Sequence, residues 1–173
     1  MNRALLVIDV QNDYFPGGRF PLWNAEETLG NIERAIACAK RLGIEIILVQ
    51  HIANAGKGIA PFFEEGTEGV EIHPRVRAAA PEALVVVKEY ADGFYRTSLL
   101  ETLEKGKIAE LLVCGMMTQN CVTHTSISKA AEAYRVAVLA DCCTTVSEML
   151  HHIALNAVST RVPVISADQA LQG

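Results

Sequence analysis

The stretch LLVCGMMTQNCVTHTSISKAAEAY, residues 111–134, decides the fold because it reads as a strand, a short loop and a helix in succession. Its first residues are almost all apolar, as in a strand that is covered on both faces of a parallel sheet. The loop places Cys121 at or near the start of the helix, at the carboxyl end of the strand. Unpaired N–H groups and the helix dipole stabilise an anion there, so we expect a thiol that ionises readily.

The same alternation of strand-like and helix-like segments runs along the whole chain. Runs rich in Val, Ile and Leu predict strands at 4–9, 44–50, 83–88, 111–115, 136–141 and 162–166. Apolar residues at helical spacing and glycine stop signals predict helices over 25–42, over 98–105, from about Cys121 onward and over 147–160. We therefore expect one α/β domain over residues 1–173, with a doubly wound, mostly parallel, Rossmann-like sheet of about six strands.

Composition narrows the class of function. The chain has 173 residues, 50% of them hydrophobic, which suits one well-formed core. A net charge of -5 without a basic stripe predicts small-molecule partners and no nucleic acid. The chain has neither an apolar run of membrane-spanning length nor the pattern of a signal peptide, so we expect a cytoplasmic protein without membrane contact. Five cysteines without CxxC pairs predict reduced thiols.

Ionisable residues end two more of the predicted strands, Asp9 after ALLVI and Lys88 after ALVVV. The carboxyl ends of parallel strands form the ligand crevice of an open sheet, so Asp9, Lys88 and Cys121 are expected to meet there. A carboxylate, an ammonium and a thiol are a suitable set for nucleophilic catalysis. The alternatives are a small buried hydrophobe at Cys121, a turn cap at Asp9 and a solvated strand end at Lys88.

One connection is much longer than the others. Residues 52–81 are rich in Gly, Pro and charged residues, and exceed the usual length of a loop in a compact domain. Segments of this kind are often lids or binding loops. Phe62 and Phe63 within it are expected to cover a pocket.

Four motifs, in this order and spacing, resemble the isochorismatase-like cysteine hydrolases over nearly the whole chain. They are LLVIDVQNDYF at 5–15, FEEGTEGVEIHP at 63–74, VVVKEYADGF at 85–94 and VCGMMTQNCVTHT at 113–125. The resemblance implies a three-layer α/β/α sandwich around a mostly parallel sheet. It also implies self-association, as a homodimer, tetramer or octamer.

The resemblance assigns a catalytic triad to Asp9, Lys88 and Cys121. It implies that Asp9 takes the thiol proton, that Lys88 balances the charge, and that Cys121 attacks an amide-like carbonyl to give a thioester. The oxyanion hole is implied at the N–H groups of Met117 and Cys121, around a cis peptide between Met116 and Met117.

Candidate substrate-binding residues surround these strand ends, and the alternative role for the aromatic ones is a subunit interface. The candidates are Gln11, Tyr14, Trp23, His51, Phe62, Tyr90 and Phe94, with Phe63 and Tyr95 as further aromatic side chains nearby. Nicotinamidases of this superfamily hold a metal through an Asp-x-His pair after the second strand. Here LVQHIAN has Gln50 at the acidic position, so we expect no metal and no cofactor, with His51 as a pocket wall or hydrogen-bonding residue.

The predicted function is hydrolysis of a C–N bond in a small amide, ureido or carbamoyl compound. One alternative is an isochorismatase-type vinyl ether hydrolase, which works by protonation and needs no thiol. The missing metal motif weakens a second alternative, a nicotinamidase. A catalytically silent oligomeric scaffold is the third, although it would not need Asp9, Lys88 and Cys121 together.

Overall fold

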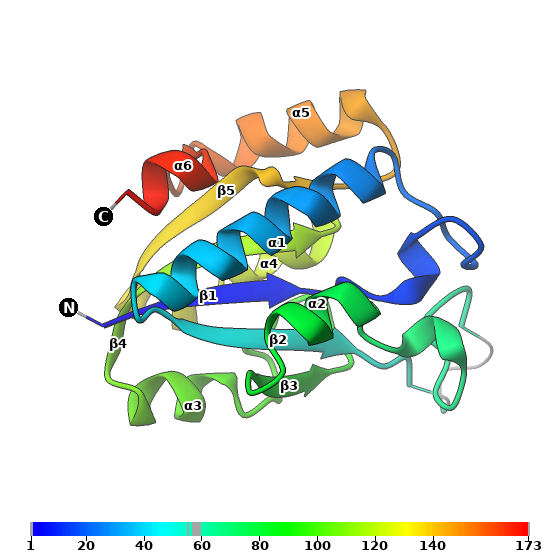
Figure 1. Cartoon of the computed structure of the whole chain (residues 1–173), viewed down its shortest axis with the longest axis horizontal. Coiled ribbons are helices and arrows are strands. Elements are labelled where there is room, and N and C mark those ends of the chain that lie inside the picture. The colour runs from blue at the N-terminus through cyan, green and yellow to red at the C-terminus, as the bar shows by residue number, and fades with distance from the viewer. Residues whose placement is uncertain (1, 55, 57–59, 173) are drawn as a thin grey trace.

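The computed structural model describes residues 2–54, 56 and 60–172 and contains one sheet flanked by helices (Figure 1). The sheet has six strands in the order β3-β2-β1-β4-β5-β6, and every neighbouring pair is parallel. Its strands are β1 (Asn2–Ile8), β2 (Glu45–His51), β3 (Leu84–Lys88), β4 (Ile108–Met116), β5 (Arg135–Thr144) and β6 (Val164–Ile165). The doubly wound α/β prediction is confirmed. The strand order reverses between β1 and β4, which is where open sheets of this kind bind ligands.

The predicted helices form close to their expected bounds. They are α1 (Ala25–Arg41), α3 (Leu99–Lys105), α4 (Thr123–Ser126) and α5 (Glu148–Val158). The sequence did not predict α2 (Pro74–Ala79), α6 (Ala167–Ala170), the short turns η1 (Asn12–Tyr14), η3 (Glu68–Val70) and η5 (Ala130–Ala133), or the π-helical turn η4 (Thr118–Val122). These elements are too short to show a helical period.

Helices cover the sheet on both sides. Figure 1 shows α1 and α2 in front of the sheet and α4 behind it. The buried face of α1 includes Leu29, Ile32, Ile36 and Ala39, and the helix is followed by Gly43, whose φ of 66° lies in the left-handed region. Fully burying one such aliphatic side chain stabilises the fold by about 1.5–3 kcal/mol.

The long segment 52–81 is tied to the loop after β1 by backbone hydrogen bonds. Gln11 forms an isolated bridge with Ile72, and the His73 N–H donates to the carbonyl of Val10 at 2.8 Å. Phe63 is buried with a φ of 61°, and its N–H donates to Asp13 Oδ2 at 2.7 Å. These contacts fix the part of the segment from Phe63 to His73 against the loop after β1.

The cysteines form no disulfide bonds in the fold. All five cysteines are free thiols, and Cys38 is the only one that is not buried. Among residues 2–54, 56 and 60–172, no helix is long and apolar enough to cross a bilayer.

Candidate active site

Three strand ends bring Asp9, Lys88 and Cys121 together. Asp9 follows β1 directly, Lys88 is the last residue of β3, and Cys121 lies in η4 just after β4. Lys88 Nζ lies 2.8 Å from Asp9 Oδ2 and donates to Cys121 Sγ at 3.2 Å. The side chains of Asp9 and Lys88 are both 0% exposed, so their charges compensate each other without help from water.

Close packing between β1 and β4 sets this geometry. A Cβ atom at Gly115 would lie 2.0 Å from the carbonyl oxygen of Ile8, and Gly115 has a φ of 119°. Only glycine fits these two conditions without strain. The ends of β1 and β4 therefore lie close together. Asp9 and the turn with Cys121, which follow these strands, begin side by side.

The ammonium of Lys88 remains charged in this buried position. Burial alone would lower its pKa, but the nearby Asp9 and Cys121 outweigh burial and raise the pKa of Lys88 above its ordinary value. Further acceptors are His51 Nδ1 at 2.9 Å and the carbonyl oxygen of Tyr90 at 3.1 Å.

The thiol of Cys121 behaves differently from the expectation of ready ionisation. Burial, and then the negative charge of Asp9, raise the pKa of Cys121 well above its ordinary value, and Lys88 offsets only part of this. The side chain lies inside a π-helical turn, and the α4 helix that follows has only four residues, so little helix dipole reaches it. The resting site thus holds a protonated thiol, and a carboxylate oxygen of Asp9 lies within 4.8 Å of its sulfur.

The peptide bond between Met116 and Met117 is cis, at the position that the resemblance gave it. The chain then turns into η4, where the N–H groups of Asn120 and Val122 donate to the carbonyl of Met117 at 3.0 and 3.3 Å. Cys121 is thereby held one turn from the cis bond.

Two of the predicted substrate residues have side chains close to the triad. His51 contacts Lys88, and its ring centroid lies 5.8 Å from that of Phe63. Tyr14 is buried with its ring centroid 4.5 Å from Phe63, and burial and the charges of Asp9 and Cys121 raise the pKa of Tyr14. Phe62 is half-buried and packs on Tyr14 at 5.4 Å.

The other predicted substrate residues have different partners. Gln11 is fully buried, and its amide binds backbone groups of His51 and Val70, so it braces the site. The Trp23 ring lies 5.8 Å from that of His151. Tyr90 contacts Tyr95 edge-on at 4.9 Å, and Phe94 stacks on Tyr134 at 6.2 Å.

One contact of the site had no signal in the sequence. His151 lies in α5. It is buried, and its Nδ1 lies 2.9 Å from the hydroxyl of Thr118, the residue after Met117. His73 is the N-cap of α2, and its side chain accepts the Arg75 N–H.

Side chains that could bind a metal ion also lie at the triad. Among the described residues, one group of side chains that could hold a metal ion consists of Asp9, His51 and Cys121, whose ligand atoms all lie within 4.8 Å of one another. Lys88 Nζ contacts each of the three at 2.8–3.2 Å, so an ammonium already takes the position to which they point.

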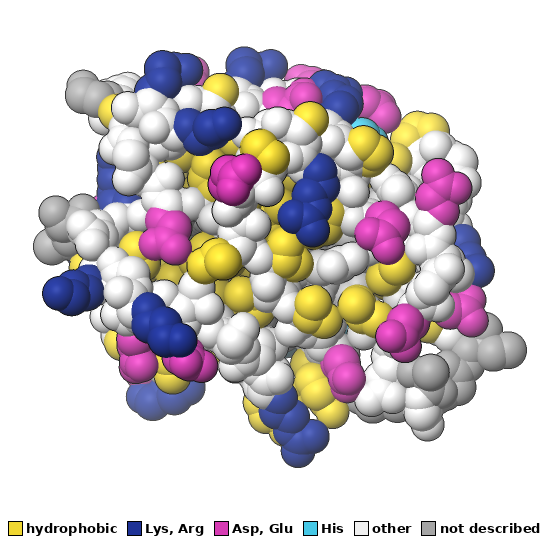
Figure 2. Space-filling view, turned by 60° about the horizontal axis from the view of Figure 1, so that its bottom comes forward, with side chains coloured by type: hydrophobic (Ala, Val, Ile, Leu, Met, Phe, Trp, Pro, Cys, Tyr) yellow, Lys and Arg dark blue, Asp and Glu magenta, His cyan; other side chains and the backbone are white. Residues whose placement is uncertain are grey.

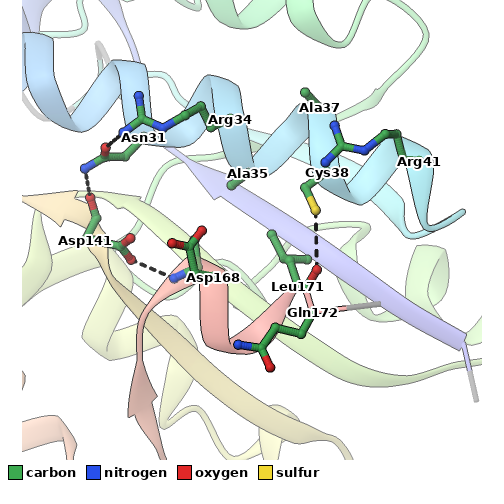
Figure 3. A pocket seen from close by; sticks show the side chains of 11 residues that line it. Asn31, Arg34, Ala35, Ala37, Cys38, Arg41, Asp141, Asp168, Leu171 and Gln172 are labelled. Carbon is green, nitrogen blue, oxygen red and sulfur yellow. Dashed lines mark hydrogen bonds between the residues drawn. The ribbon is translucent and has the colours of Figure 1, made fainter.

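A separate cavity of about 570 Å³ lies between α1 and α6 (Figure 3). Its lining includes Arg34, Cys38, Asp141 and Asp168, and the Cys38 thiol donates to the carbonyl of Leu171. No triad residue lines it. It is therefore distinct from the candidate active site.

Comparison with known proteins agrees with the fold. A family model described as the isochorismatase domain matches residues 3–169. The chain is 41% identical over 145 residues to the uncharacterized isochorismatase family protein YddQ of Bacillus subtilis (strain 168), covering 84% of this chain and 79% of that protein. It is 28% identical over 175 residues to the nicotinamidase of Escherichia coli (strain K12), with 82% of each protein covered.

A solved structure is similar over almost its full length. The crystal structure of an isochorismatase-like hydrolase from Alkaliphilus metalliredigens matches with a TM-score of 0.87 and 26% identity, over 99% of this chain and 98% of that chain. The sheet order, the strand-end site and these matches together lead to one conclusion: the chain belongs to the isochorismatase family of hydrolases.

Proposed function

We propose that this protein is a cysteine amidohydrolase that cleaves a C–N bond of a small molecule through a thioester intermediate. The observation that carries the proposal is the buried cluster in which Lys88 Nζ contacts both Asp9 Oδ2 and Cys121 Sγ. A protonated nucleophile, an acceptor for its proton and a fixed positive charge are the parts that this reaction needs.

In the first half of the reaction, Asp9 takes the proton of Cys121 as the sulfur attacks the carbonyl carbon. The carbonyl electron pair moves to oxygen, and the N–H groups of Met117 and Cys121 stabilise the resulting oxyanion. When the tetrahedral species collapses, the C–N bond breaks. Asp9 returns the proton to the leaving nitrogen, and the acyl group stays on Cys121 as a thioester.

Water completes the cycle. Asp9 takes a proton from water while the water oxygen attacks the thioester carbonyl. The C–S bond then breaks, the carboxylic acid is released, and the proton on Asp9 returns to Cys121. Lys88 remains an ammonium throughout, so it stabilises whichever neighbour carries the negative charge.

The substrate class follows from the same chemistry. An amide, ureido or carbamoyl compound offers a carbonyl carbon to the sulfur and a nitrogen leaving group to Asp9. The nicotinamidase relative supports an amide-type substrate. Nicotinamide itself receives no extra support, because Gln50 stands where the metal motif of nicotinamidases has an acidic residue. Here Gln50 instead donates to the carbonyl of Val70 at 2.9 Å and holds the long segment in place.

Ammonia release tests the proposal. The wild-type protein is incubated with a panel of small primary amides, ureido and carbamoyl compounds beside a Cys121→Ala variant. We expect release of ammonia by the wild type and a loss of at least about 10³-fold in the variant. Turnover by Cys121→Ala equal to that of the wild type would exclude Cys121 as the nucleophile and favour vinyl ether hydrolysis. Inactivity of both across the panel would favour a scaffold.

We further propose that the protein self-associates through the face that carries β3 and α3. Leu84 and Val87 of the edge strand β3 are 56% and 48% exposed, and Leu100 of α3 is 39% exposed. Figure 2 shows apolar side chains among charged ones on the side of the molecule where α3 and β3 lie in Figure 1. Exposed apolar side chains on an unpaired edge strand favour association.

Light scattering after gel filtration measures this directly. We expect a mass of at least twice that of the chain, and a shift toward one chain mass in Val87→Lys. Lys129→Glu, an exposed position outside β3 and α3, serves as the control. A wild type that runs at one chain mass at all concentrations would exclude the association.

A further inference from the structure

The Lys88 ammonium is held by more polar groups than it has protons. It lies 2.8 Å from Asp9 Oδ2, 2.9 Å from His51 Nδ1, 3.1 Å from the Tyr90 carbonyl and 3.2 Å from Cys121 Sγ. An ammonium has three N–H groups. Its position therefore depends on how strongly each of the four acceptors holds it.

This contact fixes the chemical state of His51. An ammonium can only donate, so Nδ1 of His51 must present its lone pair, and the imidazole is neutral with its proton on Nε2. A protonated imidazole would bring a second positive charge to within 2.9 Å of Lys88 and remove one acceptor.

The backbone and the ring of His51 are each held in place. The side-chain amide of Gln11 accepts the N–H of His51 and donates to its carbonyl, both at 2.8 Å. The ring itself packs against Phe63, with centroids 5.8 Å apart. His51 is also paired with Lys88 in the register of β2 and β3. Nδ1 is thus directed at the ammonium by the backbone as well as by the side-chain contact.

The four acceptors divide into two kinds during the proposed reaction. When the thiol proton passes to Asp9, the negative charge moves from Asp9 to Cys121, so both of these contacts change in strength. The contacts to His51 and to the Tyr90 carbonyl involve neutral groups and remain the same. His51 and the Tyr90 carbonyl can therefore hold the ammonium in place while the negative charge moves from Asp9 to Cys121.

We propose that His51 is a positioning residue that acts through Lys88 and keeps the ammonium between Asp9 and Cys121 during proton transfer. The inference rests on the proposed function, because it requires the thiol proton to pass to Asp9. It also gives the Asp9, His51 and Cys121 cluster a purpose other than metal binding. The cation that this cluster holds is the side chain of Lys88.

Two substitutions separate this role from a merely structural one. His51→Leu removes the acceptor, whereas His51→Asn can place its Oδ1 near the position of Nδ1 and accept from Lys88 as a neutral group. We expect kcat to fall by about 10- to 100-fold in His51→Leu with little change in KM, and to stay within about fivefold of wild type in His51→Asn. His152→Leu is the matched control, because the His152 side chain is 67% exposed on α5.

A second readout follows the thiol itself. The pH dependence of Cys121 alkylation by iodoacetamide reports the apparent pKa of the thiol. We expect His51→Leu to raise that pKa, because Lys88 no longer stays beside the thiolate, and His51→Asn to restore it. A residue that only supported the fold would lower the melting temperature and leave both the kcat and the alkylation profile unchanged.

The outcomes distinguish the possible failures. Wild-type kcat in His51→Leu would overturn the inference, as would a change confined to KM in both variants, which would make His51 a substrate-binding residue. One equivalent of metal in the purified wild type that is lost in His51→Leu would also overturn it. Full activity of Cys121→Ala would instead disprove the proposed function on which the inference rests.

Discussion

Lys88 and Asp9 form an ion pair at 2.8 Å in which neither side chain is exposed to solvent. Lys88 is the last residue of β3 and Asp9 follows β1 directly, so the pair spans the end of β2, the strand between them. Because the pair is buried, removal of one partner leaves an uncompensated charge in the interior.

Lys88→Met is therefore expected to lower the free energy of unfolding by about 3–5 kcal/mol and to abolish turnover. Urea unfolding measures the first effect. Lys105→Met is the control, since Lys105 pairs with Glu101 at 2.7 Å on the surface with both side chains mostly exposed. Such a solvent-exposed pair contributes little to the free energy of unfolding. Similar losses in the two variants would show that the buried pair has no special role in stability.

Asp9→Asn is expected to make the Cys121 thiol more reactive while abolishing turnover. After burial, the charge of Asp9 is the largest influence that raises the pKa of Cys121, and Lys88 lowers that pKa. The variant should lose amide hydrolysis and yet be alkylated faster at pH 8, because Lys88 then acts on the thiol unopposed. Asp168→Asn, remote from the site, should match wild type in both assays. Slower alkylation of Asp9→Asn would contradict the assigned electrostatics.

The free energy of unfolding is expected to fall as the pH rises above about 9. Burial raises the pKa of Cys114, Cys121, Cys142 and Cys143 above the ordinary thiol value, to about 12 for Cys143. Above about pH 9 the unfolded chain releases these protons while the folded chain retains them, so the free energy of unfolding decreases as pH rises. The stabilisation is complete below pH 9 and is lost as pH rises toward the folded-state values.

Urea unfolding at pH 8, 9 and 10 measures this slope. Each thiol contributes up to about 1.4 kcal/mol per pH unit once its unfolded form is ionised. Cys142→Ala should therefore flatten the pH dependence, whereas Cys38→Ala serves as a control at a half-buried position. A slope that stays the same in both variants would show that the buried thiols do not cause it.

Gly115→Ala is expected to disrupt the junction of β1 and β4. The new Cβ would lie 2.0 Å from the Ile8 carbonyl oxygen, and the backbone of Gly115 has a φ of 119°. We expect a loss of more than about 3 kcal/mol, measured by urea unfolding. Gly30→Ala in α1 is the matched control, since the nearest atom to its Cβ is 3.7 Å away, and it should stabilise the helix by about 0.5–1 kcal/mol. Equal stability of the two variants would contradict the close approach.

The sequence predicted the parts of the site that depend on strand ends. Asp9, Lys88 and Cys121 follow apolar runs that form parallel strands, and such strands present their carboxyl ends at one edge. The ionisation of Cys121 was predicted wrongly, because burial and the distance to Asp9 are tertiary properties that local sequence does not contain. The contact of His151 with Thr118 was missed for the same reason, since 33 residues separate them.

Intact mass spectrometry of the protein, quenched with acid during turnover of a slow amide or ester substrate, shows whether a thioester forms on Cys121. We expect the mass of the wild type to increase by the acyl group of the substrate, fragmentation to locate that group on Cys121, and Cys121→Ala to gain no mass. Turnover without any adduct in the wild type, joined with undiminished turnover in Cys121→Ala, would contradict the account.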